Sequence, residues 1–455
     1  MRRQERPLRV TLHALGCRTN QYEAEALGSM FLERGWDVVS EPPWDLGILF
    51  SCSVTAVAER KSRALLRRFL RQSPGCRRIL CSCYAQNLLR HKKPFPEADL
   101  VVGNRIKYRI PQLAEALFRG EPLEQYQELE GTPQTWNSWD DLKLFRLLWH
   151  TRGFVKIQDG CDHFCSYCII SHLRGKPVSR PEEAILEEVC RLTAGGCGEI
   201  VLTGIHLGRY GGTGNGEPLG RLVQKISRIA GVRRIRFGSL EPFSITPAFL
   251  TMLRDTPQFC PHFHIPLQSG NDEVLRRMKR GYTVREFANI LSLIRNIFGE
   301  HVHVSTDLLV GFPGEDSQAF EGTLKVVEEM NFGKLHVFPF SPREGTPAFS
   351  WPRPSRQEAE ERARRGVALG EILLARYASR WLGQTVEILV EKTESSEEPY
   401  FQGHTPHFLL ARFPGRAFSG EERRGRVAAL AGGELLCTPL SEKDNLPEDD
   451  RGGVS

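Results

Sequence analysis

Three cysteines lie close together in the chain, at Cys161, Cys165 and Cys168. Their C-x3-C-x2-C spacing supplies three thiolates, which can hold three irons of a four-iron cluster and leave the fourth iron open. A cluster with four cysteine ligands only passes electrons, whereas an open iron can coordinate a small molecule and act on it. The triplet therefore predicts a catalytic iron–sulfur cluster.

A structural zinc site is the alternative interpretation of this triplet. Such sites usually pair two C-x2-C halves that lie about 12 to 20 residues apart. No second half follows Cys168, but His163 and His172 could complete a tetrahedral site. The zinc interpretation therefore stays open at this point.

The composition indicates a reduced, cytoplasmic protein. Twelve cysteines in 455 residues are far fewer than a disulfide-stapled scaffold carries. The charged amino terminus has no apolar signal-peptide core behind it, and the mean hydropathy of −0.33 with no apolar run of about 18 residues predicts no membrane span. The net charge of +6 permits a nucleic-acid partner without requiring one.

Apolar, β-branched runs alternate with amphipathic stretches through the centre of the chain, which predicts six βα units and a parallel sheet or partial barrel. Capping boxes at Ser179–Glu182 and Thr283–Glu286, and Thr246 before Pro247, predict three helix starts. The expected strands are Phe154–Ile157, Glu199–Thr203, Arg234–Gly238, His262–Leu267, His301–Val310 and Lys334–Phe340.

Polar or small residues follow the carboxyl ends of these strands, where ligands bind in parallel α/β folds. The cysteine triplet follows the first strand, and Glu241 could accept hydrogen bonds from hydroxyl groups of a ligand. Ordinary loop capping explains any one of these positions equally well. The others are Thr203, Gly204, Ser239 and Gln268.

The amino-terminal third predicts a βαβ unit with three further cysteines at its strand ends. Short buried strands are expected at Val10–Leu15, Leu46–Phe50 and Arg77–Cys81. The cysteines at or beyond their carboxyl ends can converge, because those ends share one edge of a parallel sheet. A second cluster is one interpretation, and three separately buried cysteines, packed as small hydrophobes, are the other. These cysteines are Cys17, Cys52 and Cys83.

The motif around the first triplet, with Tyr167 before its third cysteine, resembles the radical S-adenosylmethionine enzymes. The segments Ala14–Tyr22, Ser51–Thr55, Arg60–Arg63 and Cys83–Gln86 resemble the amino-terminal domain of the radical methylthiotransferases. Within that family the closest resemblance is to the branch that acts on N6-threonylcarbamoyladenosine in tRNA. Together with Gln158–Arg180, the resemblance covers nearly the whole chain.

The resemblance implies two [4Fe-4S] clusters and S-adenosylmethionine as cofactors. It implies that Cys161, Cys165 and Cys168 hold the cluster at which the radical is generated, so that no side chain is itself the catalyst, and that the three amino-terminal cysteines hold the second cluster. It also implies cofactor contacts at Tyr167, Thr203, Gly204, Ser239, Glu241 and Gln268. Four positions depart from the family pattern, namely Ser51, Ser82, Ser171 and Val178, and none is a cluster ligand.

The resemblance further implies a flavodoxin-like amino-terminal domain, a partial (β/α)6 radical S-adenosylmethionine barrel, and a small carboxyl-terminal β-barrel of the RNA-binding type called TRAM. Strands at Thr385–Val390, His407–Phe413 and Arg426–Leu436 are expected in that barrel. The expected boundaries are 8–120, a linker at 121–147, 148–380, 381–441, and a disordered tail at 442–455.

Two regions could contact RNA. In the small barrel Arg412 is a candidate, with the aromatic residues around it, although such aromatics fill a barrel core equally well. Arg60, Arg63 and Arg67 fall on one face of an expected helix, Ala56–Arg71, where they could neutralise phosphates or form a plain solvated surface.

The expected substrate is the tRNA anticodon loop, with a separate electron donor and an oligomeric state that the sequence leaves open. The alternative substrates are isopentenyladenosine in tRNA and an aspartate of a ribosomal protein. A cluster-containing RNA-binding regulator without turnover is the remaining alternative.

Overall fold

The computed structural model describes residues 6–395 and 398–440. They form two compact units, of which the first comprises residues up to 253 together with 276–281 and 340–353. The second comprises 254–275, 282–339 and the residues from 354 onward. The segment boundaries expected from the sequence remain predictions, and the expected tail at 442–455 lies outside the described residues.

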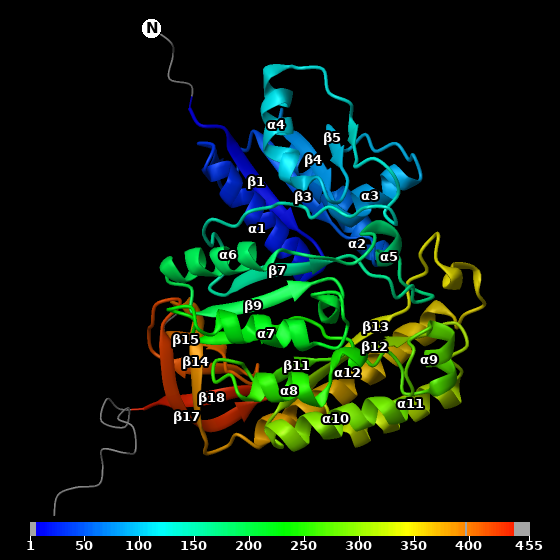
Figure 1. The fold of residues 1–455 in the computed structure, drawn as a ribbon, viewed down its shortest axis with the longest axis vertical. Helices are drawn as coiled ribbons and strands as arrows, with labels where there is room; N and C mark the ends of the chain where they lie inside the picture. The colour runs from blue at the N-terminus through cyan, green and yellow to red at the C-terminus, as the bar shows by residue number, and fades with distance from the viewer. Residues whose placement is uncertain (1–5, 396–397, 441–455) are drawn as a thin grey trace, which may run out of the picture. The chain divides into compact units, whose positions relative to one another are not determined.

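The first unit begins with a parallel sheet in the order β2-β1-β3-β4-β5-β6 (Figure 1). The order 2-1-3-4-5 is that of flavodoxin-like folds, so the predicted topology is confirmed. The sixth strand comes from the segment expected to be a linker. The strands are β1 (Arg9–Ala14), β2 (Asp37–Val38), β3 (Leu46–Ser51), β4 (Arg77–Cys81), β5 (Leu100–Val102) and β6 (Tyr126–Gln127).

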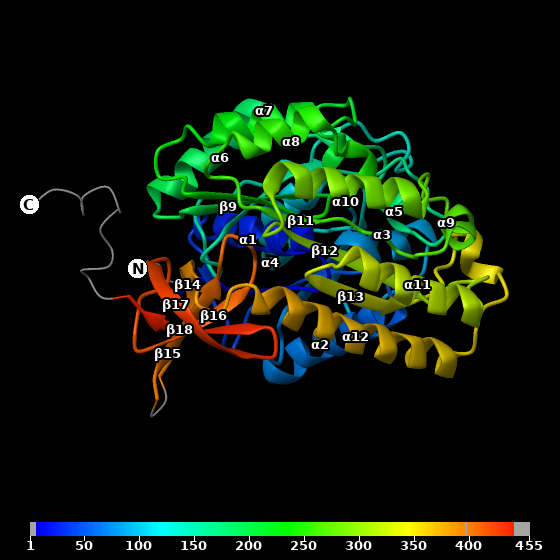
Figure 2. The ribbon, with the colours of Figure 1, turned by 90° about the horizontal axis from the view of Figure 1, so that it is seen from below.

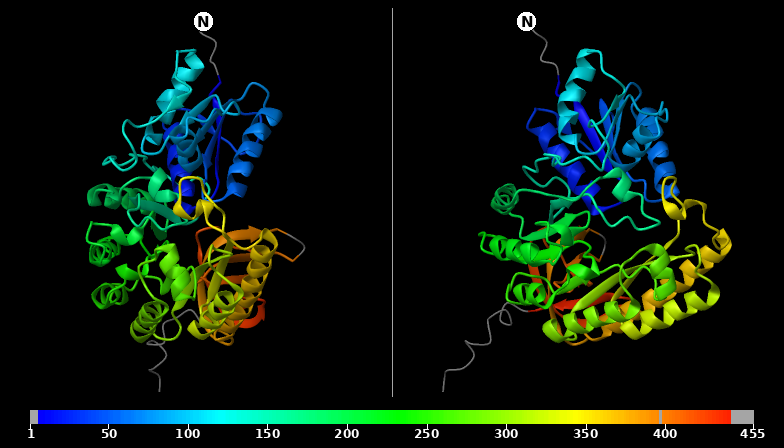
Figure 3. Two further views of the ribbon diagram at one scale, coloured as in Figure 1. Left: turned by 90° about the vertical axis from the view of Figure 1, so that its right-hand side faces the viewer. Right: turned by 45° about the vertical axis from the view of Figure 1, so that its right-hand side comes forward.

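Helices cover both faces of this sheet, as right-handed crossovers on either side of β1 require. Helices α1 (Arg18–Leu32) and α4 (Ile110–Arg119) contact each other, while α2 (Ala56–Gln72) and α3 (Ser82–Arg90) pack against β3 and β4. In the right-hand view of Figure 3 the blue and cyan strands stand between these two pairs. Phe69 of α2 is fully buried in this core, beside the Trp44 ring.

A second sheet in the first unit has the order β10-β9-β7-β8. Strands β7 (Gly153–Asp159), β9 (Glu199–Gly204) and β10 (Arg234–Phe237) are parallel, whereas β8 (Val178–Ser179) pairs antiparallel with β7. The helices between them are α5 (Ile170–Leu173), α6 (Glu182–Ala194) and α7 (Glu217–Ile226), and α8 (Pro247–Arg254) follows β10.

The predicted capping box at Ser179–Glu182 is wrong. Ser179 lies in β8, where its hydroxyl donates to Gln158 Oε1 at 2.8 Å, and α6 begins only after Pro181. The reason is that a proline forces the residue before it into extended backbone, which removes Arg180 from the helix. The start at Pro247 is confirmed, because Thr246 Oγ1 accepts a hydrogen bond from Phe249 N.

The second unit contains the parallel sheet β11-β12-β13 with helices along it (Figure 2). The capping box at Thr283 is confirmed. All six expected strands of the central region therefore exist, distributed over two sheets. The elements are β11 (His262–His264), β12 (His303–Val310), β13 (Lys334–Pro339), α10 (Val284–Phe298), α11 (Ser317–Met330) and α12 (Arg356–Ser379). Helix α9 (Asp272–Met278) begins in the second unit, and its last three residues belong to the first.

The second unit ends in a closed barrel of five strands, drawn in orange and red in Figure 3. The barrel confirms the expected fold class, but the single strand expected at Arg426–Leu436 is wrong: this segment contains parts of two antiparallel strands joined by a turn at Gly432 and Gly433. Phe401 and Phe413 stack in its core with ring centroids 5.2 Å apart, so Phe401 serves packing. The strands are β14 (Thr385–Glu394), β15 (Tyr400–His404), β16 (Leu410–Pro414), β17 (Glu422–Ala431) and β18 (Glu434–Pro439). Within the described part of the chain, no helix has both the length and the apolar character that a membrane crossing needs.

We expect Gly47→Ala to destabilise the amino-terminal sheet. A Cβ at this position of β3 would lie 2.4 Å from Phe69 Cδ2, so the buried ring of α2 would have to move. Overpacking of this kind costs about 1 to 3 kcal/mol. The free energy of unfolding, measured by urea denaturation, tests this. The matched control is Gly322→Ala in α11, where the new methyl meets no atom within 4 Å and the helix gains about 0.5 to 1 kcal/mol.

Candidate active site

The first cysteine trio lies in a loop that leaves the carboxyl end of β7 and returns through α5. Gly160 opens the loop with a φ of +80°, and an added Cβ would lie 2.0 Å from Lys176 O. Cys161 N donates to Gly175 O at 2.9 Å and so closes the neck of the loop. Only glycine fits at Gly160, because both the backbone conformation and the close approach exclude a side chain.

The sulfur atoms of the first trio receive N–H donors within a buried setting. His163 N donates to Cys161 Sγ at 3.5 Å, and an Arg280 Nη donates to Cys165 Sγ at 3.4 Å. Burial raises the pKa of Cys161 to about 12 and also raises the pKa of Cys168. Without metal these thiols therefore stay protonated at neutral pH, and metal binding must release their protons. Cys165 is buried and the other two are partly buried, and N–H donors to the sulfurs of Cys161 and Cys165 fit the thiolate ligands of an iron–sulfur cluster.

The two histidines of the zinc alternative have other contacts. His163 Nε2 lies 3.1 Å from Arg280 O, and the His172 ring packs against the Phe164 ring at 5.5 Å. These contacts do not support a zinc site at the triplet.

A strand-end carboxylate is linked to this trio through an arginine that the sequence did not single out. Arg280 donates to Glu241 Oε2 at 2.5 Å, and its other Nη lies near both Cys165 Sγ and the Tyr167 hydroxyl, at 3.4 Å and 3.5 Å. Burial raises the pKa of Tyr167 well above its usual value, so the phenol stays neutral. The predicted residues Glu241 and Tyr167 are thus brought together with Cys165. No local pattern could have indicated Arg280, which is more than a hundred residues away in the chain.

The other predicted strand-end residues behave differently. Thr203 is buried in β9, and a Cβ at Gly204 would lie 2.5 Å from Gln158 O, so the strand pairing itself requires glycine there. Ser239 lies two residues after the end of β10. Gln268 belongs to the second unit, where its N donates to Asp307 O at 2.8 Å and its φ is +69°. The cofactor contacts of these four residues remain predictions.

A cavity of about 380 Å³ opens beside Cys161. Arg209 lines it and pairs with Asp162 at 2.7 Å, and the neighbouring His206 Nδ1 lies 3.6 Å from Cys161 Sγ. Ser171, a departure from the family pattern, also lines the cavity, and its buried hydroxyl has no hydrogen-bond partner in the described residues. The cavity therefore places polar and charged groups beside the first trio.

The second trio lies at the carboxyl edge of the flavodoxin-like sheet. Cys17 follows β1, Cys52 follows β3, and Cys83 lies in the first turn of α3 after β4. A Cβ on Gly16 would lie 2.8 Å from Cys52 Sγ, so the segments after β1 and β3 approach closely. Burial, followed by the charges of Cys83 and Cys17, raises the pKa of Cys52 to about 12. The structure thus brings these three cysteines near one another at the topological switch point, where such folds bind ligands.

Two departures from the family pattern lie next to this trio and have a structural explanation. Ser82, where the family has glycine, adopts a φ of +72°, and its hydroxyl donates to Glu23 Oε2 at 3.2 Å. Ser51 Oγ donates to Cys81 O at 2.5 Å and so ties the end of β3 to β4. Both serines therefore preserve the backbone path that carries Cys52 and Cys83.

A fully buried arginine, Arg174, also reaches this trio. Its Nε donates to Cys83 Sγ at 3.3 Å, and its Nη atoms donate to Glu23, Asp159 and Asn20. Cys83, Glu23 and Asn20 are all far from Arg174 in the sequence, so no spacing rule could have predicted that Arg174 contacts Cys83.

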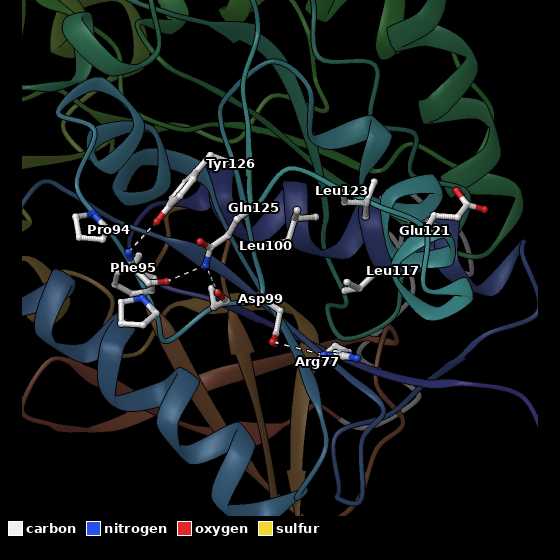
Figure 4. Close-up of a pocket in the computed structure, with 12 residues that line it drawn as sticks. Arg77, Pro94, Phe95, Asp99, Leu100, Leu117, Glu121, Leu123, Gln125 and Tyr126 are labelled. Atoms are coloured by element: carbon white, nitrogen blue, oxygen red, sulfur yellow. Dashed lines mark hydrogen bonds and ion pairs between the residues drawn. The ribbon is translucent and has the colours of Figure 1, made fainter.

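A second cavity of the first unit, about 680 Å³, does not lie at either trio. Figure 4 shows its lining, including Phe95, Gln125 and Tyr126. Arg77 and Leu100, which begin β4 and β5, place it at the amino ends of strands whose carboxyl ends face Cys83. Ligands of parallel sheets bind at the carboxyl ends, so this cavity is not the active site.

The predicted RNA-contacting arginines have mixed surroundings. Arg60 is exposed, with no hydrogen bond or ion pair to another described residue, whereas Arg63 and Arg67 both pair with Glu97, at 3.3 Å and 2.8 Å. In the barrel, Arg412 pairs with Glu434 at 3.1 Å and lies over the Tyr400 ring. Their contacts with RNA remain predictions.

Two family models match the chain. Residues 155–327 match the radical SAM superfamily, and residues 9–103 match a family described as uncharacterized protein family UPF0004. The solved structure of the radical S-adenosylmethionine methyltransferase TsrM from Kitasatospora setae, with cobalamin and a [4Fe-4S] cluster bound, has a TM-score of 0.56 at 13% identity, over 75% of this chain and 74% of that chain. This likeness shows the fold alone.

Curated relatives match over most of the chain. The threonylcarbamoyladenosine tRNA methylthiotransferase MtaB of Bacillus subtilis is 34% identical, over 89% of this chain and 90% of its own length. The MtaB protein of Thermotoga maritima is 32% identical over 96% and 99%. The tRNA-2-methylthio-N(6)-dimethylallyladenosine synthase of Methylacidiphilum infernorum is 32% identical over 95% and 94%.

We expect Gly160→Ala to abolish iron binding at the first trio. The added methyl meets Lys176 O at 2.0 Å and also opposes a left-handed backbone, so the neck of the loop must open. The iron and acid-labile sulfide content of the reconstituted protein should fall by the amount that the first cluster contributes. Gly196→Ala is the control, because Gly196 has a φ of +90° but no atom within 4 Å of the new Cβ. Equal iron loss in both variants would contradict the role of the neck.

Proposed function

Because this chain belongs to the radical S-adenosylmethionine methylthiotransferases that modify tRNA, we propose that its substrate is N6-threonylcarbamoyladenosine beside the anticodon, and that it replaces the hydrogen on carbon 2 of the adenine with a methylthio group. The observation that carries the proposal is the presence of two cysteine trios at the carboxyl edges of two parallel sheets in one compact unit. One trio suffices to cleave the cofactor, whereas a sulfur transfer needs a second.

We propose that Cys161, Cys165 and Cys168 hold one [4Fe-4S] cluster and that Cys17, Cys52 and Cys83 hold the other. When bound, the first cluster with S-adenosylmethionine supplies the radical, and the second supplies the sulfur. Adenine carbon 2 has no leaving group, so a nucleophilic side chain could not exchange its hydrogen for sulfur. This chemistry explains why no acid, base or nucleophile of the chain is assigned a catalytic role.

The chain's own residues bind and orient the cofactor. Arg280 fixes the Glu241 carboxylate at 2.5 Å, which leaves the second carboxylate oxygen available to accept hydrogen bonds from hydroxyl groups. Thr203, Gly204 and Ser239 end or follow the neighbouring strands, and the Tyr167 hydroxyl lies 3.5 Å from an Arg280 Nη. Gln268, in the second unit, is assigned to the same role by the family resemblance.

The RNA contacts are proposed from charge and exposure. A base in the anticodon loop must leave its stack to reach the site, which costs a few kcal/mol and is least costly in single-stranded RNA. Arg60 can neutralise a phosphate directly, whereas Arg63 and Arg67 must share their charge with Glu97. Arg412 is the corresponding candidate of the barrel. We also propose a separate electron donor, because the cluster must be reduced. We propose a cytoplasmic location, because the enzyme must bind tRNA.

Dimethylallyladenosine in tRNA is the second candidate substrate. The observation that favours it is that relatives named for it match this chain at 30–32% identity, nearly as high as those named for threonylcarbamoyladenosine. The ribosomal-protein aspartate has no such support among the relatives described above. The regulator alternative is set aside, because the family is one of enzymes.

Mass spectrometry of tRNA nucleosides tests the substrate. In a strain that lacks this gene and has no paralogue, the 2-methylthio form of N6-threonylcarbamoyladenosine should disappear and the unmodified nucleoside should accumulate. Its restoration by the plasmid-borne gene is the control. Loss of the methylthio group from dimethylallyladenosine instead would select the second candidate and reject the first.

Cys83→Ala tests whether the two trios have separate roles. The variant should still form 5′-deoxyadenosine from S-adenosylmethionine, because the first trio is intact, but methylthiolation of tRNA should fall below detection. Cys76→Ala is the matched control, since Cys76 is a buried cysteine of the same domain that lies within the apolar core. It should retain both activities. Methylthiolation by the Cys83 variant would reject the second cluster.

A further inference from the structure

Arg174 is surrounded by a buried ionic cluster that joins the two sheets of the first unit. Lys156 of β7 pairs with Glu23 of α1 at 2.7 Å and with Asp159 at 2.6 Å, and Lys107 pairs with Asp140 at 2.6 Å. Arg174 pairs with Glu23 at 3.0 Å and with Asp159 at 3.2 Å. All of these side chains are almost completely excluded from solvent.

The charges of this cluster do not balance among the described residues. Its cations are Arg105, Lys107, Lys156 and Arg174, and its carboxylates are Glu23, Asp140 and Asp159. One positive charge is therefore in excess. A buried charge without a counter-charge is costly, so a further anion is needed at the cluster's edge.

The missing anion has an identifiable place. Arg174 Nε donates a hydrogen bond to Cys83 Sγ at 3.3 Å. A cysteine thiolate that ligates a cluster is negative, and it would balance the excess charge where Arg174 meets it. The remaining donors of Arg174 are already used by the carboxylates and by Asn20 Oδ1, at 3.0 Å.

We propose that Arg174 is a positioning residue for the second cluster: it holds the Cys83 thiolate by a charge-assisted N–H···S bond and stabilises the reduced form of that cluster. The proposal rests on the proposed function, which places a cluster at Cys17, Cys52 and Cys83. A nearby positive charge and a hydrogen bond to sulfur both favour the state that carries the extra electron, so they raise the reduction potential.

Only arginine can make this set of contacts. The guanidinium carries five N–H donors in a fixed plane, which here reach a sulfur, an amide oxygen and two carboxylates in different directions. A lysine has three donors on one nitrogen and could keep the charge while losing the bond to Cys83. This difference separates the electrostatic part of the effect from the geometric part.

Arg174 also ties the second trio to the loop of the first. It follows α5 in the loop that carries the first trio, and its carbonyl accepts a hydrogen bond from Arg105 at 2.8 Å. Arg174 therefore directly precedes Gly175 of the neck in the chain, while its side chain reaches the second trio. Its removal should affect the second cluster far more than the first, because its side chain contacts only Cys83 among the six cysteines.

The test uses the full-length, reconstituted protein with Arg174→Gln and Arg174→Lys. The readouts are the midpoint potential of each cluster, from a redox titration followed by electron paramagnetic resonance, and the rate at which a chelator removes iron. With Arg174→Gln, the potential of the second cluster should shift negative and its iron should be lost several-fold faster. Arg174→Lys should give a smaller shift in the same direction, and the first cluster should keep its potential in both.

Arg180→Gln is the matched control. Arg180 is a buried arginine of the same segment that pairs with Glu188 at 2.9 Å and touches none of the cluster cysteines. It should leave the potential of the second cluster unchanged. An unchanged potential in Arg174→Gln, or an equal shift in the Arg180 control, would overturn the proposal.

Failure of the proposed function would look different. Cys83→Ala measured in parallel should lose the second cluster's iron and its resonance signal. If it kept both, no cluster would be held by Cys83, and the two-cluster function would fall independently of Arg174. If Arg174→Gln cannot be obtained folded, Arg174→Lys decides, because an unshifted potential and unchanged iron loss in that variant also reject the N–H···S bond.

Discussion

The buried carboxylate of Glu23 is the interaction on which the arrangement of the first unit depends. Burial alone would raise its pKa, but Arg174, Lys107 and Lys156 outweigh that effect and hold the pKa well below its usual range. The carboxylate on α1 of the flavodoxin-like sheet therefore stays ionised and binds a lysine from β7 of the other sheet. Removal of one partner from such a group typically costs about 3 to 5 kcal/mol, so the ion pairs hold the two sheets together in one register.

That register matters because both trios depend on strand ends. The first cysteine of the first trio lies two residues after Asp159, the last residue of β7. The cysteines of the second trio follow the carboxyl ends of β1, β3 and β4. The same cluster of charges touches β7 through Lys156 and the second trio through Arg174. An apolar contact of equal area would tolerate sliding, whereas ion pairs with fixed donors and acceptors do not. The cysteines of both sites are thus set by one polar network.

The sequence predicted the residues that local rules govern. Cysteines at strand ends follow from apolar periodicity and from the edge geometry of parallel sheets, so all six could be located from the sequence. The contacts of Arg174 and Arg280 with cysteines could not be predicted, because each depends on a partner distant in the chain. The same holds for the ion pairs of Glu97 with Arg63 and Arg67. The capping box at Ser179 failed since a neighbouring proline overrode it, and β6 was missed because two residues of strand carry no periodicity.

The three serines that depart from the family pattern fall into two physical classes. Ser51 and Ser82 each form a hydrogen bond through the hydroxyl beside the second trio, Ser51 to Cys81 O and Ser82 to Glu23 Oε2. Ser171 does not, because its buried hydroxyl lines the cavity beside Cys161 without a hydrogen-bond partner among the described residues. A buried, unsatisfied hydroxyl costs free energy that a ligand acceptor or donor would recover. Of the three serines, Ser171 is therefore the one whose chemistry can change what is bound next to the first trio, while the hydroxyls of the other two are already hydrogen-bonded beside the second trio.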